Sequence, residues 1–178
     1  MLNLQLARKY AGAIFAIAQE EDKLTAYGEE LDQVKNDLFS VEGAKSFFQN
    51  PQIQPQAKKE LLTKLFEGEL SPHIYHFLLL LVDKRRIGIL ADIAAEYHAL
   101  ANKAMGIIIA DVTTVSPMES GQEQKLKAKL EEVTGKTVEL RHHQDESIIG
   151  GVVVKIGDRR LDGSVAGRLA GLARELKG

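Results

Sequence analysis

Apolar residues over positions 1–105 recur at intervals of three and four, the spacing that places them on one face of an α-helix. Pro55 and the pair Ser71-Pro72 have the sequence of helix starts, because proline is favoured in the first helical turn. Gly68 and Gly106 stand where helices would end. The pattern predicts six short helices joined by brief loops, the last of them over residues 87–105, packed as a compact bundle.

Segment 74–82 departs from this two-faced pattern. Its residues are almost all large and apolar, so for about two turns the predicted helix has no polar face. Such a helix lies at the centre of a core, or it has one face that awaits a partner. The partner would be an apolar helical segment of another chain lying in a groove. Segment 10–18 is also short of large polar residues, so the same two alternatives apply to it.

The period of the pattern changes at Gly106. Residues 107–115 are rich in β-branched side chains and predict a strand. The sequence Ser116-Pro117-Met118-Glu119 has the composition of a capping box with proline in the first turn, which predicts a helix from there to about Thr134. Residues 137–142 then alternate between apolar and polar, as in a second strand.

The run from Ile148 to Leu169 predicts two more strands and a last helix. Its β-branched residues 152–156 favour a strand, and Gly157-Asp158 is a turn signal before a short return strand. Asp162 and Ser164 are both good helix N-caps, and they compete for that role. The predicted fold class is therefore mainly α. A six-helix bundle at residues 1–105 is followed by a smaller α+β domain at residues 106–178, of order β-α-β-β-β-α.

Composition narrows the classes of function. The chain of 178 residues has no cysteine, which excludes disulfides and thiolate metal sites. Its formal charge of −2 argues against nucleic acid as a partner. The longest apolar run, residues 77–82, is far shorter than a membrane span, and no secretory signal pattern is visible. We expect a cytosolic protein, with peripheral attachment to a membrane complex left open.

Two short glycine-containing motifs resemble parts of known catalytic loops in sequence, but they lack the neighbouring elements or residues that those loops require. Gly135-Lys136-Thr137 is similar to the end of a phosphate-binding loop, yet it follows a predicted helix and precedes a strand, which is the reverse of the required order. Residues 163–167 are similar to a nucleophile elbow, but Asp162 stands where the first glycine is needed. Neither motif supports a catalytic residue or a cofactor site.

The histidines and the one basic run have simple structural explanations. His73 and His76 lie three apart on a predicted helix, without a third ligand to complete a metal site. His142 and His143 alternate along a strand and so face opposite ways. Residues 84–86, Lys-Arg-Arg, provide favourable charge at a helix C-terminus or contact an acidic neighbour. We therefore expect no metal, no cofactor and no catalytic group.

The C-terminal part of the chain contains a specific set of residues, Gly135-Lys136, Asp145, Ile149-Gly150-Gly151, Gly157-Asp158, Asp162-Gly163-Ser164, Arg168 and Leu169. With this set the chain resembles, over nearly its whole length, the delta subunit of the F-type ATP synthase, the family that includes the mitochondrial oligomycin sensitivity-conferring protein. Weaker likenesses are the opening segment 7–11 and a middle stretch of Lys84-Arg85-Arg86, Leu90, Ile93 and Tyr97. Arg160 departs from the family pattern, in which an apolar residue is more usual.

The resemblance implies a non-catalytic stator subunit of a proton-translocating ATP synthase, on the cytoplasmic face of the bacterial inner membrane and associated with the membrane only through the complex. It implies that residues 1–105 bind the N-terminal segments of the alpha subunits and that residues 106–178 bind the C-terminal end of the stalk formed by the b subunits. The implied alpha-binding residues are Tyr10, Ala13, Ile14, Ile17, Phe77, Leu80 and Leu81. The implied structural signature is Gly150, Gly151, Gly157, Asp158, Asp162, Gly163, Ser164 and Arg168. The alternative is a helical adaptor or scaffold unrelated to energy coupling.

Overall fold

The computed structural model describes residues 2–40 and 43–175 of the chain. It is mainly helical, as predicted, with a small four-stranded mixed sheet. The chain divides into two compact units, residues 1–101 and 102–178. The division falls within the last helix of the first unit, four residues before the change of pattern at Gly106.

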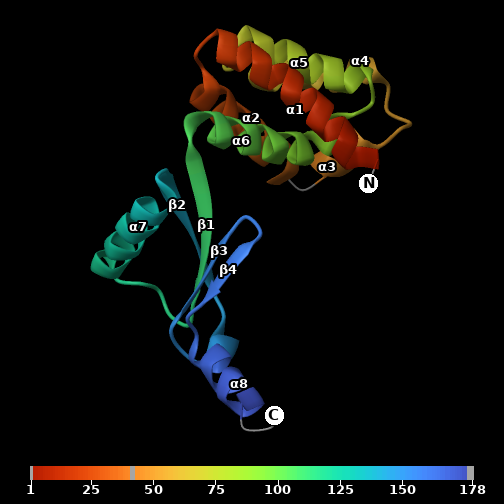
Figure 1. The fold of residues 1–178 in the computed structure, drawn as a ribbon. Helices are drawn as coiled ribbons and strands as arrows, with labels where there is room; N and C mark the ends of the chain where they lie inside the picture. The colour runs from red at the N-terminus through yellow and green to blue at the C-terminus, as the bar shows by residue number, and fades with distance from the viewer. Residues whose placement is uncertain (1, 41–42, 176–178) are drawn as a thin grey trace. The chain divides into compact units, whose positions relative to one another are not determined.

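In residues 2–40 and 43–101 the first unit forms helices and no strand (Figure 1). Pro55 and Pro72 stand in the first turn of their helices, as the sequence predicted. The predicted helix over residues 87–105 begins instead as a short 3-10 segment. The elements are α1 (Leu2–Glu20), α2 (Leu24–Ser40), α3 (Ala44–Gln49), α4 (Pro55–Phe66), α5 (Pro72–Asp83), η1 (Ile87–Ile89) and α6 (Leu90–Met105).

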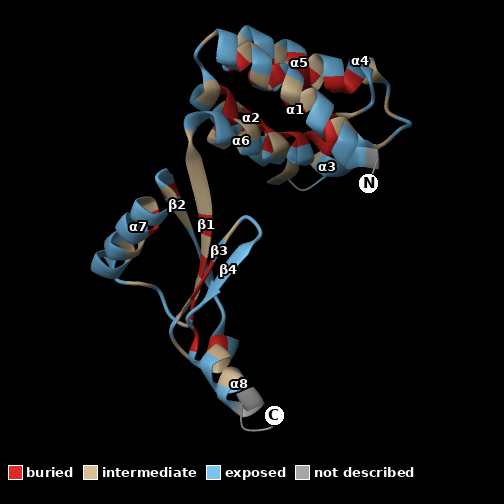
Figure 2. Cartoon of the chain, in the orientation of Figure 1, coloured by how far each residue is buried: buried red, intermediate tan, exposed pale blue. Residues whose placement is uncertain are grey.

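Burial is concentrated on the faces that these helices turn toward one another (Figure 2). Helix α5 packs against α1, α2 and α4, and its Ile74, Leu78 and Leu81 are fully buried in the core. Tyr97 of α6 is also fully buried, and its hydroxyl donates a hydrogen bond to the carbonyl of Leu24 at 2.8 Å. One face of α5 therefore lies in the core, as the first alternative expected, while Leu80 on another face is exposed.

The second unit pairs a helix with a mixed sheet of strand order β2-β1-β3-β4. Strands β1 and β2 are parallel and are joined through α7, whereas β3 is antiparallel to both β1 and β4. Ala110, Val112, Leu130, Val138 and Val154 form its small core. The elements are β1 (Ile107–Thr114), α7 (Ser120–Thr134), β2 (Thr137–Gln144), η2 (Glu146–Ile148), β3 (Val152–Ile156), β4 (Arg159–Asp162) and α8 (Val165–Glu175).

The capping box predicted at residues 116–119 is wrong. Helix α7 begins at Ser120, and its N-cap, Glu119, makes no capping hydrogen bond through its side chain. The backbone of Ser116 is used differently, since its carbonyl accepts a 2.7 Å hydrogen bond from the Thr114 hydroxyl. Met118 packs against the core of the sheet unit, so these residues form a packed loop rather than a first helical turn.

Candidate functional site

The helical unit has an apolar groove of about 440 Å³ between α1 and α5. Six of the seven residues expected to bind a partner line this groove. They are Tyr10, Ala13, Ile14 and Ile17 from α1, and Phe77 and Leu80 from α5. The groove is thus a strip of side chains from two helices that are far apart in the sequence.

The lining residues divide into a floor and a rim. Ile14 is 1% exposed and Phe77 is 8% exposed, so both belong to the core as well as to the groove. Tyr10 meets Phe77 edge to face, with ring centroids 6.3 Å apart and planes at 64°. This arrangement is favourable for aromatic pairs and fixes the floor. Ala13 and Leu80 are exposed, which makes them the residues that a partner would reach first.

Leu81 is the expected residue that the structure does not place in the groove. It is fully buried with Ile74 and Leu78, on the face of α5 that packs into the core. The groove face of α5 instead carries His73, His76, Phe77 and Leu80. Spacings of three and four connect residues on every face of a helix, and segment 77–82 is apolar throughout, so apolar spacing alone did not separate Leu81 from Leu80.

Three polar residues at the groove are additions to the expected set. Lys9, His73 and His76 line it together with the apolar side chains. The sequence contained a sign of the two histidines, because positions 73, 76, 77 and 80 have the spacing that places His73 and His76 on the same helix face as Phe77 and Leu80. Both histidines are exposed, so they lie at the rim of the groove. In the described part of the chain no cluster of three His, Cys, Asp or Glu side chains is arranged to hold a metal ion.

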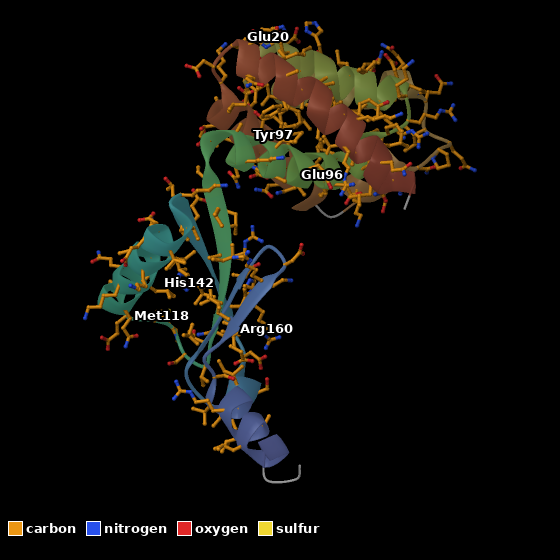
Figure 3. All side chains as sticks on the ribbon, viewed as in Figure 1. Glu20, Glu96, Tyr97, Met118, His142 and Arg160 are labelled. Carbon is orange, nitrogen blue, oxygen red and sulfur yellow. The ribbon has the colours of Figure 1, made fainter. Side chains whose placement is uncertain are left out.

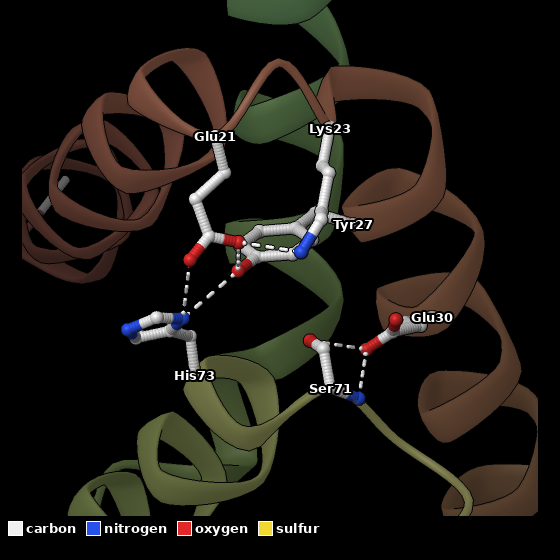
Figure 4. A network of polar contacts seen from close by, with 6 residues as sticks. All are labelled: Glu21, Lys23, Tyr27, Glu30, Ser71 and His73. Atoms are coloured by element: carbon white, nitrogen blue, oxygen red, sulfur yellow. Dashed lines mark hydrogen bonds and ion pairs between the residues drawn. The ribbon is translucent and has the colours of Figure 1, made fainter.

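His73 connects the groove to a network at the α1–α2 corner (Figure 4). Its Nδ1 lies 3.1 Å from the Tyr27 hydroxyl and 3.1 Å from Glu21 Oε1. The Tyr27 hydroxyl donates to Glu21 Oε2 at 2.7 Å, and Lys23 Nζ donates to the same oxygen at 3.0 Å. These bonds lower the pKa of Glu21, the Tyr27 bond most. Burial, followed by the carboxylate, raises the pKa of Tyr27 to about 12.

Ser71 fixes the beginning of α5 in an unexpected way. Ser71 is the N-cap of α5, as the sequence predicted, but its side chain makes no capping hydrogen bond. Its hydroxyl instead donates to Glu30 Oε2 of α2 at 2.8 Å, and its backbone N–H donates to the same oxygen at 2.9 Å (Figure 4). A carboxylate that accepts two bonds from one residue holds that residue closely. The N-terminal end of α5, the helix that forms one wall of the groove, is therefore attached to α2.

In the sheet unit the signature residues form a structural corner between β4 and α8. Asp162 Oδ1 accepts hydrogen bonds from the Ser164 hydroxyl at 2.6 Å and from its backbone N–H at 3.0 Å. The Ser164 hydroxyl oxygen in turn accepts from the Gly167 N–H at 2.9 Å, so Ser164 caps α8 and Asp162 positions it. Ser164 is buried and fully engaged, which fits a structural role.

The glycines of this corner allow close backbone packing. The Gly163 N–H donates to the Val152 carbonyl, and the Val165 N–H donates to the Gly150 carbonyl, both at 2.9 Å. Gly151 has φ +82°, and a Cβ added there would lie 2.4 Å from the Gly163 carbonyl oxygen. Of the remaining signature residues, Gly157-Asp158 form the β3–β4 turn, and the exposed Arg168 lies in the first turn of α8.

The corner carries an exposed apolar strip, which we call the α8 strip. It consists of Val165, Leu169 and Leu172, spaced to share one face of α8 and all exposed. Ile149 and Leu161 on neighbouring segments are also exposed. Contiguous exposed apolar residues of this kind mark interaction surfaces.

The two strand histidines face opposite ways, as their spacing predicted. His142 Nε2 lies 3.2 Å from Glu123 Oε1 of α7, whereas His143 Nε2 lies 3.1 Å from Asp111 Oδ1 of β1. His142 is labelled in Figure 3. Both pairs tie elements of the sheet unit together. They are exposed structural contacts and do not converge on one site.

An apolar groove and an exposed apolar helix face are typical of a protein that connects other proteins. Comparison with known proteins identifies the kind of assembly. Residues 6–176 match the family model described as ATP synthase delta (OSCP) subunit. The chain belongs to this family.

Individual relatives agree over almost the whole chain. The ATP synthase subunit delta of Desulforamulus reducens is 41% identical over 176 residues, covering 99% of this chain and 97% of the relative. That of Coxiella burnetii is 38% identical over 184 residues, covering 99% of each. A chain in the cryo-EM structure of the Toxoplasma gondii mitochondrial ATP synthase hexamer matches with a TM-score of 0.73 and 25% identity, covering 97% of this chain and 98% of that chain. The protein is therefore a non-catalytic, peripheral-stalk subunit.

Proposed function

We propose that this protein joins the catalytic head of the ATP synthase to its peripheral stalk through two separate surfaces. In this proposal residues 1–105 act as a six-helix bundle that binds the N-terminal segments of the alpha subunits. Residues 106–178 act as a β-α-β-β-β-α domain that binds the C-terminal end of the b subunits. The observation that carries the proposal is the α1–α5 groove, which has an apolar floor, an exposed apolar rim and a size suited to helix side chains.

The groove suits a helical segment because its lining runs along two helices rather than around a closed pocket. Ile14 and Phe77 supply a fixed apolar floor, and Leu80 and Ala13 supply the accessible edge. An amphipathic helix places anchors at intervals of three and four residues into such a groove. Each Å² of apolar surface that it buries contributes about 25 cal/mol before association costs. A stator must not slip while the central stalk turns, and buried apolar contact favours slow dissociation.

Binding of a synthetic peptide from the N-terminus of the alpha chain to the full-length protein tests the groove. We expect Leu80→Asp and Ala13→Asp each to lower the affinity for the peptide about tenfold or more, since a charge in an apolar contact must be desolvated. Leu65→Asp is the matched control, because Leu65 on α4 is 46% exposed, against 43% for Leu80, and does not line the groove. Equal affinities for Leu80→Asp and Leu65→Asp would assign the peptide to another surface.

The stalk-binding surface is proposed to include the α8 strip. Leu169 lies at its centre and is more than half exposed, so it contributes apolar surface that nothing within the described chain covers. We expect Leu169→Asp to weaken binding of a fragment from the C-terminal end of the b subunits while leaving the alpha peptide unaffected. Val133→Asp on α7 is the control, since Val133 is 74% exposed and lies outside the strip. Normal binding of the fragment by Leu169→Asp would remove the strip from the interface.

We propose that the protein sits at the cytoplasmic face of the bacterial inner membrane and is held there only through the complex. Its bacterial relatives support this location. No helix in the described ranges has the length and apolarity needed to cross a bilayer. Reconstitution separates this function from that of an adaptor unrelated to energy coupling. Membrane vesicles stripped of the protein should regain ATP-driven proton pumping when it is added back, and no recovery would favour the adaptor.

A further inference from the structure

The helical unit contains a second cavity, of about 320 Å³, that shares no lining residue with the α1–α5 groove. Its walls come from α1, α3, α4, α5 and η1, and its polar lining residues are Asn3, Gln49, Lys58 and Arg85. None of the described residues that line it is acidic. The cavity therefore combines two cations and two amides without a carboxylate.

Lys58 is the one side chain with a formal charge that is buried among the described residues, at 8% exposure. Its Nζ donates hydrogen bonds to the carbonyls of Phe48 and Asn50, both at 2.7 Å. These bonds satisfy the end of α3, but an ammonium has three N–H groups, and the third has no acceptor among the described residues. Burial lowers the pKa of the Lys58 ammonium, and the neighbouring guanidinium of Arg85 lowers it further. A buried cation is normally paired with an anion.

Arg85 stands at a position where glycine would be the easier residue. It follows α5 with φ +55°, in the left-handed region, and its backbone N–H donates to the Val82 carbonyl at 2.9 Å. A glycine would end the helix equally well and without strain. The arginine adds only its side chain, which lines the cavity and has no ion pair with a described carboxylate. Lys59, by contrast, pairs with Asp83.

We propose that this cavity binds a small divalent oxyanion of the phosphate class between the Lys58 ammonium and the Arg85 guanidinium. The planar guanidinium suits two oxygens of such an anion, and the ammonium supplies its remaining N–H. The amides of Asn3 and Gln49 are available as further donors. The volume admits a phosphate group with a small substituent. The bound anion joins α4 to the loop between α5 and η1 and, through Asn3, to α1, and it removes the repulsion between the two cations.

Calorimetric titration of the full chain with inorganic phosphate, at constant ionic strength set with sodium chloride, tests the proposal. We expect saturable binding with one site per chain. Arg85→Gly should fold at least as stably as the wild type without phosphate, yet bind phosphate about tenfold more weakly or worse, because a charge-assisted contact is lost. Lys84→Gln is the matched control, since it removes the same charge from the adjacent residue, which does not line the cavity.

The possible outcomes are distinct. Phosphate and sulfate also act on proteins in general, by being excluded from the surface. A titration signal that does not saturate, and that is the same in the wild type, Arg85→Gly and Lys84→Gln, overturns the proposal. Equal phosphate affinity in Arg85→Gly and Lys84→Gln also overturns it. A parallel titration with glycerol 3-phosphate identifies the source of the anion: binding like that of phosphate indicates a phosphorylated small molecule, and its absence indicates the free ion.

Discussion

Replacing Gly151 by alanine tests whether the corner between β3 and α8 depends on close backbone contact. Gly151 has φ +82°, and an added Cβ would lie 2.4 Å from the Gly163 carbonyl oxygen and 3.1 Å from the Ser164 Cα. Both neighbours are backbone atoms, so no side chain can rotate away. Gly157 is the matched control, because its φ is +56° but no atom lies within 4 Å of an added Cβ.

The expected magnitudes follow from this difference. The left-handed backbone alone disfavours alanine by about 1–2 kcal/mol at either position. The overlap at Gly151 adds about 1–3 kcal/mol, as when a well-packed site is overfilled. We therefore expect Gly151→Ala to destabilise the sheet unit by about 2–5 kcal/mol, and Gly157→Ala by about 1–2 kcal/mol.

Hydrogen exchange of the β1 and β3 amides measures the loss, since each 1.4 kcal/mol accelerates exchange about tenfold. All 4 tyrosines and 6 phenylalanines lie within residues 1–101, so tyrosine fluorescence during urea unfolding follows the helical unit alone. That transition should keep its midpoint in both variants. Equal exchange rates in Gly151→Ala and Gly157→Ala would refute the argument from backbone contact.

Three further outcomes follow from the described contacts. Tyr97→Phe removes the buried donor to the Leu24 carbonyl, and the helical unit should lose about 1–2 kcal/mol in urea unfolding; an unchanged midpoint would contradict this. Leu78→Ala opens a cavity in the same core and should cost about 2–5 kcal/mol by the same assay, so a loss under about 1 kcal/mol would show that the site collapses. Hydrogen bonds from Ser164 hold the pKa of Asp162 below its usual value, so the ionised carboxylate stabilises the fold above about pH 4, and this stability is lost as the pH falls through the pKa of the folded state. In urea unfolding followed by circular dichroism, Asp162→Asn should make the stability less dependent on acid pH, and a pH profile identical to that of the wild type would refute this.

Local sequence signals predicted the elements that depend on local chemistry. The two first-turn prolines and the change of period at Gly106 mark real boundaries, because proline geometry and side-chain alternation act within a few residues. The excess of apolar residues indicated the two helices that line the groove, and the family resemblance implied the six individual residues that the structure places there. Leu81 lies on the core face of α5, which the uniformly apolar segment 77–82 does not reveal by itself.

Features that depend on distant parts of the chain were missed. Lys58 lies in an amphipathic helix, where lysine normally indicates the solvent face, and it is buried because the carbonyls that end α3 accept its hydrogen bonds. Ser71 is the N-cap of α5, as predicted, but its hydroxyl donates to Glu30 on another helix and not to its own helix. In both cases the deciding partner comes from another element, and the local pattern contains no sign of it.

The strand register has a mechanical consequence for the sheet unit. Strand β1 begins two residues after α6 ends, and its far end, Thr114, pairs with Val152. The end of β4, Asp162, pairs with Val153 and leads directly into α8. Residue 106 and α8 are thus attached at opposite ends of the sheet. A pulling force between residue 106 and α8 therefore acts along the strands. It loads the hydrogen bonds between the strands in shear, all at once, and does not break them one after another.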